Sequence, residues 1–77
     1  MSVAVAHTLD MRGLSCPLPI VNTARAIKEM SSGDLVEVLA TDPGSVQDFA
    51  AWCRSTGHEL VTSSQDEGVY RFVVRKR

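Results

Sequence analysis

Ser15-Cys16-Pro17-Leu18-Pro19-Ile20 is the stretch on which both the fold and the chemistry of this chain depend. The two prolines predict a helix start, because a proline in the first helical turn loses no hydrogen bond through its missing N–H. We expect Cys16 at the N-cap and Pro17 at the first helical position. The thiol would then lie at the positive end of the helix, which should favour the thiolate and make Cys16 nucleophilic.

The residues around the thiol fit this interpretation. Gly13 allows a positive φ or a close backbone approach in the loop that delivers Cys16. Arg12 either places a cation near the thiol, which would lower its pKa, or is a solvated loop residue. Pro19 stands where a thioredoxin-like site has its second cysteine, so no local disulfide can form. Cys16 is therefore expected to attack or to carry, with Pro17, Pro19, Arg12 and Gly13 in support.

Hydrophobic periodicity outward from this motif predicts the order β-α-β-α-β-β. Alternating or continuous apolar runs indicate strands, and apolar residues three or four apart indicate helices. Asp42-Pro43 repeats the pattern of the first helix start, with Asp42 as N-cap, and Gly33 and Gly57 should end the two helices. The expected elements are strands at residues 5–10, 35–40, 60–64 and 69–75, helices at 17–30 and from 43 to 56, and a hairpin turn at 66–68.

The same spacing predicts which face of each helix is buried. The first helix should bury Ile20, Ala24 and Ile27, supported by Val21 and Met30. The second helix should bury Val46, Phe49, Ala50 and Cys53. Cys53 is thus expected to be a buried, inert thiol rather than a second sulfur or redox site, and Trp52 beside it to be partial core rather than a partner anchor.

Alternating strands and helices followed by a hairpin indicate an α/β fold. Right-handed crossovers should place both helices on one face of a mixed four-stranded sheet, which gives a two-layer sandwich with residues 35–40 as a central strand. The chain has 77 residues and no internal linker, so a single domain spanning residues 1–77 is expected.

The composition of the chain bears on its class of function and on its location. The net charge of −1 gives no strong signal for nucleic-acid binding. The start of the chain lacks a basic n-region, and no apolar run is long enough to span a bilayer, so a cytoplasmic location is expected. Two distant cysteines, with His7 and His58 far apart, make a metal site improbable, and no cofactor is expected.

The chain resembles the TusA/SirA family of small sulfur carrier proteins over residues 8–75. The residues that carry the resemblance are Leu9-Asp10, Gly13, Cys16-Pro17-Leu18-Pro19, Asp42-Pro43 and Tyr70-Arg71-Phe72. The resemblance implies strand order 1-2-4-3, with Cys16 carrying sulfane sulfur as a persulfide and Pro17 and Pro19 holding the helix start. It implies a sulfurtransferase-type carrier rather than a turnover enzyme. No membrane partner is expected.

The resemblance also implies protein partners. A cysteine desulfurase or a rhodanese would donate sulfur, and acceptors of the Tus, Dsr or heterodisulfide-reductase-like type would receive it. The relay would serve tRNA thiolation, molybdenum cofactor biosynthesis or dissimilatory sulfur oxidation. Leu18, which should not face the core, and Arg25, on the wet side of the first helix, are the candidate partner contacts.

Two alternatives remain open from the residues alone. One is a non-catalytic RNA-binding or regulatory module of the same fold, which predicts a contiguous basic face and a function indifferent to Cys16. Its binding would weaken steeply as salt rises. The other is a redox-sensing thiol, which predicts a stable sulfenic acid or an intermolecular disulfide at Cys16 under peroxide.

Overall fold

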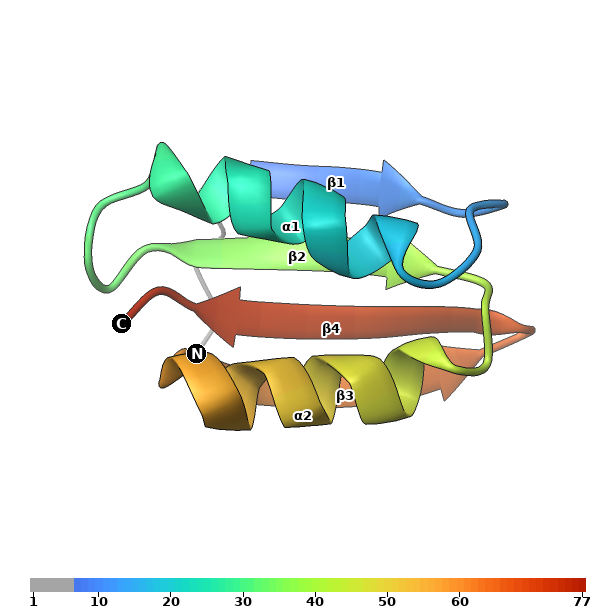
Figure 1. Ribbon diagram of the computed structural model, residues 1–77. Coiled ribbons are helices and arrows are strands. Elements are labelled where there is room, and N and C mark those ends of the chain that lie inside the picture. Colours follow the sequence, from blue (N-terminus) through green and yellow to red (C-terminus); the bar gives the residue numbers. More distant parts are fainter. Residues whose placement is uncertain (1–6) are drawn as a thin grey trace.

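A computed structural model describes residues 7–77 (Figure 1). In chain order the elements are β1 (His7–Met11), α1 (Leu18–Lys28), β2 (Leu35–Ala40), α2 (Ser45–Thr56), β3 (Glu59–Asp66) and β4 (Val69–Arg75). The beginning of the expected first strand, at residues 5 and 6, lies outside the described residues. Between residues 7 and 77, no helix has both the length and the apolar character needed to cross a membrane.

The four strands form one mixed sheet in the order β1-β2-β4-β3. β1 pairs with β2 in parallel, and β4 pairs in antiparallel fashion with β2 on one side and β3 on the other. Both helices cover the same face of the sheet (Figure 1). The predicted two-layer architecture and the strand order are therefore confirmed, including the central position of β2.

The core lies between the helices and the helix-facing side of the sheet. Val36 and Val38 of β2 and Phe72 of β4 are fully buried there, together with Phe49 of α2. The rings of Phe49 and Phe72 stack with their centroids 4.5 Å apart. This aromatic pair attaches α2 to the middle of the sheet.

The buried faces of the helices differ from the predicted ones. In α2, Val46 is 40% exposed and Ala50 is also exposed, whereas Ser45 is buried with Phe49 and Cys53. Phe49 is fully buried and stacks on Phe72, so the side of α2 that carries Phe49 faces the sheet, and Val46 and Ala50 lie on the side exposed to solvent.

The first helix shows a similar rotation. Val21 is 38% exposed, while Pro19, Thr23 and Ile27, each four residues apart, face the sheet. The hydroxyl of Thr23 donates a hydrogen bond of 2.7 Å to the carbonyl of Pro19, which allows a polar side chain to be buried. Ile20 and Ala24 are only half-buried.

The helix ends and the hairpin confirm one predicted terminator and correct the other. Gly57 ends α2 at φ 84° and donates to the carbonyl of Cys53, as predicted. Gly33 also has a positive φ, 90°, but α1 ends earlier, at Lys28, so Gly33 lies in the following loop. β3 runs to Asp66, and the hairpin turn consists of Glu67 and Gly68, both with positive φ, as tight two-residue turns require.

Candidate functional site

Cys16 lies in the loop between β1 and α1, at the end of the sheet where both helices begin (Figure 1). Its side chain is exposed. α1 starts at Leu18 with Pro17 as its N-cap, so the helix begins one residue later than predicted and Cys16 precedes the N-cap. The Leu18 amide donates to the carbonyl of Ser15 at 2.9 Å, and this turn displaces the helix start.

Asp42 connects the loop of Cys16 to the loop before α2. One oxygen of its carboxylate accepts the Cys16 backbone N–H at 2.6 Å, and the other accepts the Gly44 N–H at 3.0 Å. These two bonds lower the pKa of Asp42. The prediction that Asp42 is the N-cap of α2 is therefore wrong, because Gly44 occupies that position and Pro43 precedes it. The carboxylate instead bridges the two loops.

Asp48 contacts the sulfur itself. The Cys16 thiol donates to the Oδ2 atom of Asp48, in the first turn of α2, with Sγ and Oδ2 2.6 Å apart. This hydrogen bond raises the pKa of Cys16, and the negative charges of Asp48 and Asp42 raise it further. The expectation that the helix end would favour the thiolate is thus wrong, because the hydrogen bond to Asp48, partial desolvation and the two negative charges all raise the pKa of the thiol.

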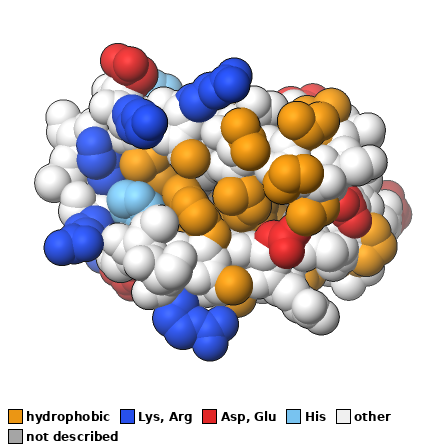
Figure 2. All heavy atoms as spheres, in the orientation of Figure 1, with side chains coloured by type: hydrophobic (Ala, Val, Ile, Leu, Met, Phe, Trp, Pro, Cys, Tyr) orange, Lys and Arg blue, Asp and Glu red, His pale blue; other side chains and the backbone are white. Residues whose placement is uncertain are grey.

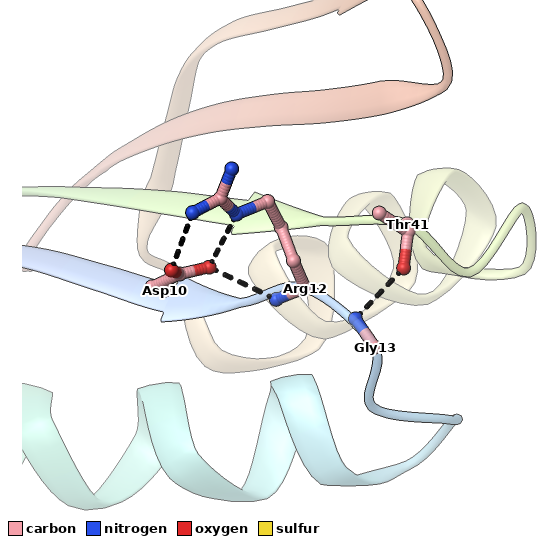
Figure 3. A network of polar contacts seen from close by, with 4 residues as sticks. All are labelled: Asp10, Arg12, Gly13 and Thr41. Atoms are coloured by element: carbon pink, nitrogen blue, oxygen red, sulfur yellow. Dashed lines mark hydrogen bonds and ion pairs between the residues drawn. The ribbon is translucent and has the colours of Figure 1, made fainter.

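Arg12 does not act on the thiol. Its Nε and Nη2 atoms each donate at 2.8 Å to a different oxygen of Asp10, and its backbone N–H also reaches that carboxylate (Figure 3). The bidentate ion pair lowers the pKa of Asp10 to about 2 and raises that of Arg12. Of the two interpretations left open for Arg12, the solvated loop residue fits the structure: the guanidinium is exposed and paired with Asp10, and it is not among the groups that shift the pKa of Cys16.

Gly13 adopts the positive φ that the sequence suggested, at 83°. Its N–H donates to the hydroxyl of Thr41 at 2.9 Å, a bond drawn in Figure 3. Together with the bond between Cys16 and Asp42, this contact joins the β1–α1 loop to the β2–α2 loop at two points. The position of the sulfur is therefore set by both loops.

Apolar side chains surround the beginnings of the two helices. The large hydrophobic residues exposed in the described part of the chain are Leu18, Val21 and Val46, with Leu18 at 46%. All three lie in the first two turns of α1 or α2. Figure 2 shows hydrophobic side chains gathered on the helical face, with acidic side chains at the end where the helices begin. Arg25 is exposed in the last turn of α1.

The second cysteine is in a different environment. Cys53 is 5% exposed in the core cluster, and burial raises its pKa to about 11. The predicted burial of this thiol is confirmed. Trp52 is half-buried and packs edge-on against Phe49, with ring centroids 6.1 Å apart, which confirms its partial core position.

The two histidines lie apart, as expected from the sequence. His7 is exposed in β1, and the Nδ1 atom of His58, just after α2, accepts the backbone N–H of Arg77 at 3.0 Å.

The contact between Asp48 and Cys16 was missed by sequence reasoning. An acidic residue in the first turn of a helix is usually explained by the helix dipole, and Asp48 fits that pattern. The signal that could have suggested more is the parallel pairing of the first two strands, since it places the two following helix starts at one end of the sheet.

Comparison with known proteins identifies the family. The family model described as sulfurtransferase TusA matches residues 7–76. The sulfur carrier protein TusA of Allochromatium vinosum is 47% identical over 68 residues, 88% of this chain and 90% of that protein. The TusA of Pseudomonas aeruginosa strain LESB58 is 35% identical over 77 residues, 100% of this chain and 98% of that protein.

A solved structure shows the same fold. The crystal structure of the SirA-like protein from Desulfitobacterium hafniense superposes with a TM-score of 0.80 at 25% identity, covering 90% of this chain and 95% of that one. The motif around Cys16, the strand order and these similarities agree: the chain belongs to the TusA family of sulfur carrier proteins.

Proposed function

We propose that this protein carries sulfane sulfur as a persulfide on Cys16 and passes it from a donor protein to an acceptor protein. The single observation that carries the proposal is the exposed Cys16 thiol at the end of the sheet where both helices begin, within the range that the family model matches. Cysteine desulfurases and rhodaneses are the expected donor classes. The use of the sulfur in tRNA thiolation, molybdenum cofactor biosynthesis or sulfur oxidation depends on the acceptor.

The two thiols differ in the way that a single carrier site requires. Cys16 is exposed, whereas Cys53 is buried with a pKa of about 11, so only Cys16 can meet a partner's sulfur. Residues 7–77 form no pocket. Sulfur transfer suits such a surface, because it needs access to one atom rather than enclosure of a small substrate.

The transfer is an exchange between sulfur atoms. The Cys16 sulfur attacks the outer sulfur of a donor persulfide, R–S–SH, and a new S–S bond forms as the donor's S–S bond breaks. The electron pair stays on the donor sulfur, which leaves as R–SH after taking the proton that Cys16 loses. The products are Cys16–S–SH and the donor thiol, and the reverse sequence passes the sulfur to an acceptor thiol.

The surface beside Cys16 supports docking of another protein. Leu18 is 46% exposed two residues from Cys16, and Val21 and Val46 add further exposed apolar area on the same end of the two helices. Exposed hydrophobic clusters of this kind are typical of interaction surfaces. We propose Leu18 as a contact for donor and acceptor, and Arg25, in the last turn of α1, as a charged contact farther along the same helix.

The proposal is tested by mass spectrometry of the intact protein. After incubation with a cysteine desulfurase and cysteine, or with a rhodanese and thiosulfate, the protein should gain the mass of one sulfur atom, and a reductant should remove it. Cys53→Ser is the matched control and should gain the same mass. A Cys16→Ser protein that still gained the sulfur would contradict the assignment.

A further inference from the structure

We propose that Asp48 is a positioning residue that keeps Cys16 a neutral thiol in the free protein, so that sulfur transfer is favoured when the partner brings a positive charge to this carboxylate. The inference rests on the proposed function and adds to it a requirement on the partner. It concerns when the sulfur becomes reactive rather than which atom carries it.

The geometry places the carboxylate directly on the sulfur. Oδ2 of Asp48 accepts the thiol hydrogen of Cys16 at 2.6 Å, across the gap between the starts of α2 and α1. A thiolate at this position would lose that hydrogen bond and would face a negative oxygen instead. The protonated thiol is therefore the form that the free protein favours.

The charges around the sulfur have one sign. The groups that act on the Cys16 sulfur are Asp48, from α2, and Asp42, from the preceding loop. The guanidinium nearest in sequence, that of Arg12, is engaged by Asp10 in a bidentate pair. Within residues 7–77 no cation is found to offset the two carboxylates at the sulfur. A compensating positive charge thus has to come from another molecule.

A partner's lysine or arginine at Asp48 would change both chemical states of Cys16. Before transfer, a cation there would draw the carboxylate away from the thiol hydrogen and stabilise the thiolate that attacks the donor's sulfane sulfur. After transfer, the terminal sulfur of the persulfide is anionic at neutral pH, and Asp48 would repel it away from the helix start. The same carboxylate therefore lowers the reactivity of the Cys16 thiol before loading and turns the persulfide sulfur away from the helix start after loading.

The first test is the pH dependence of Cys16 alkylation by iodoacetamide in the Cys53→Ser background. Asp48→Asn should move the midpoint of the rate profile to lower pH, because the acceptor charge is gone while the side chain keeps its size. For each pH unit of that movement the rate at neutral pH should rise about threefold, since a tenfold gain in thiolate is partly offset by lower nucleophilicity. Asp48→Glu, which keeps the charge, should stay near the wild-type profile.

The second test asks whether the sulfur prefers a cationic donor. Two alkyl methanethiosulfonates, one with a trimethylammonium group and one with a sulfonate group on the alkyl chain, each transfer an alkylthio group to Cys16. A new S–S bond forms as the bond between the reagent's thiol sulfur and its sulfonyl sulfur breaks, methanesulfinate leaves with the electron pair, and the thiol proton goes to the buffer. The ratio of the cationic to the anionic rate should fall roughly fivefold to tenfold in Asp48→Asn. Glu29→Gln, which removes the same charge at the far end of α1, should leave the ratio unchanged.

The inference is overturned if Asp48→Asn leaves the midpoint and the reagent ratio at their wild-type values, or moves the midpoint to higher pH. It is also overturned if Glu29→Gln lowers the ratio as much, since the effect would then reflect net charge alone. Thermal unfolding of each variant shows whether the comparison is between folded proteins. Neither reagent depends on sulfur carriage, so a failure here is distinct from a failure of Cys16 to gain sulfur.

Discussion

Replacing Phe49 with alanine should remove a large part of the stability of this protein. Phe49 is fully buried, stacks on Phe72 with centroids 4.5 Å apart and contacts the edge of Trp52. Truncating such a side chain costs about 3–5 kcal/mol. At roughly 0.05–0.15 kcal/mol per residue, a chain of 77 residues has a free energy of unfolding of about 4–12 kcal/mol. The melting temperature should therefore fall by more than about 12 °C.

The matched control is Val46→Ala, one turn earlier on the same helix. Val46 is 40% exposed, so this variant should change the free energy of unfolding by less than about 0.5 kcal/mol. Urea unfolding followed by far-UV circular dichroism gives both values without relying on the fluorescence of Trp52, which Phe49 contacts. Equal losses in the two variants would refute the placement of the α2 face against the sheet.

Three further outcomes follow from the structure. Near neutral pH the folded protein should take up one iodoacetamide label, on Cys16, and a second on Cys53 only in denaturant, because burial raises the pKa of Cys53 to about 11; rapid labelling of both thiols in the native state would contradict this. The folded-state pKa of Asp10 is lowered from 3.8 to about 2, so its contribution to stability is present above pH 3.8 and is lost as the pH falls to about 2. Asp10→Asn should flatten that part of the stability profile in urea titrations at several pH values, and a profile as steep as the wild type would argue against the pairing. Gly57→Ala should lower the free energy of unfolding by about 1–2 kcal/mol, since φ is 84° there, and a Cβ would lie 2.9 Å from the side chain of Arg77; an unchanged melting temperature would show that the helix end can relax.

The strands were easier to predict than the helix starts. β2 and β4 have the predicted bounds because their apolar residues, interrupted only by Glu37 in β2 and by Arg71 in β4, end at polar or turn residues. α1 starts one residue later than predicted, because a proline can occupy either the N-cap or the first helical position and the sequence does not distinguish the two for Pro17. The face of α2 was ambiguous for a similar reason: apolar residues on adjacent positions satisfy two neighbouring stripes, and only packing against Phe72 selects one.

The location of the site followed from the motif, but its electrostatics did not. Cys16 forms hydrogen bonds with Asp42 and Asp48, which lie 26 and 32 positions further along the chain. Periodicity gives no information on such a contact, which depends on the relative placement of two helix starts. The partner of Arg12 was predictable from the sequence, because Asp10 is only two residues away. An ion pair at that spacing competes directly with an interaction between Arg12 and the thiol of Cys16.

The dependence of Cys16 on later residues means that its chemistry belongs to the tertiary structure. A short synthetic segment covering the β1–α1 loop would include every residue of the motif and neither of the two aspartates. Its sulfur would ionise as an ordinary cysteine does, more readily than in the native molecule. Cys16 should therefore react faster with electrophiles in a nascent or denatured chain than in the folded protein, because folding raises the pKa of its thiol.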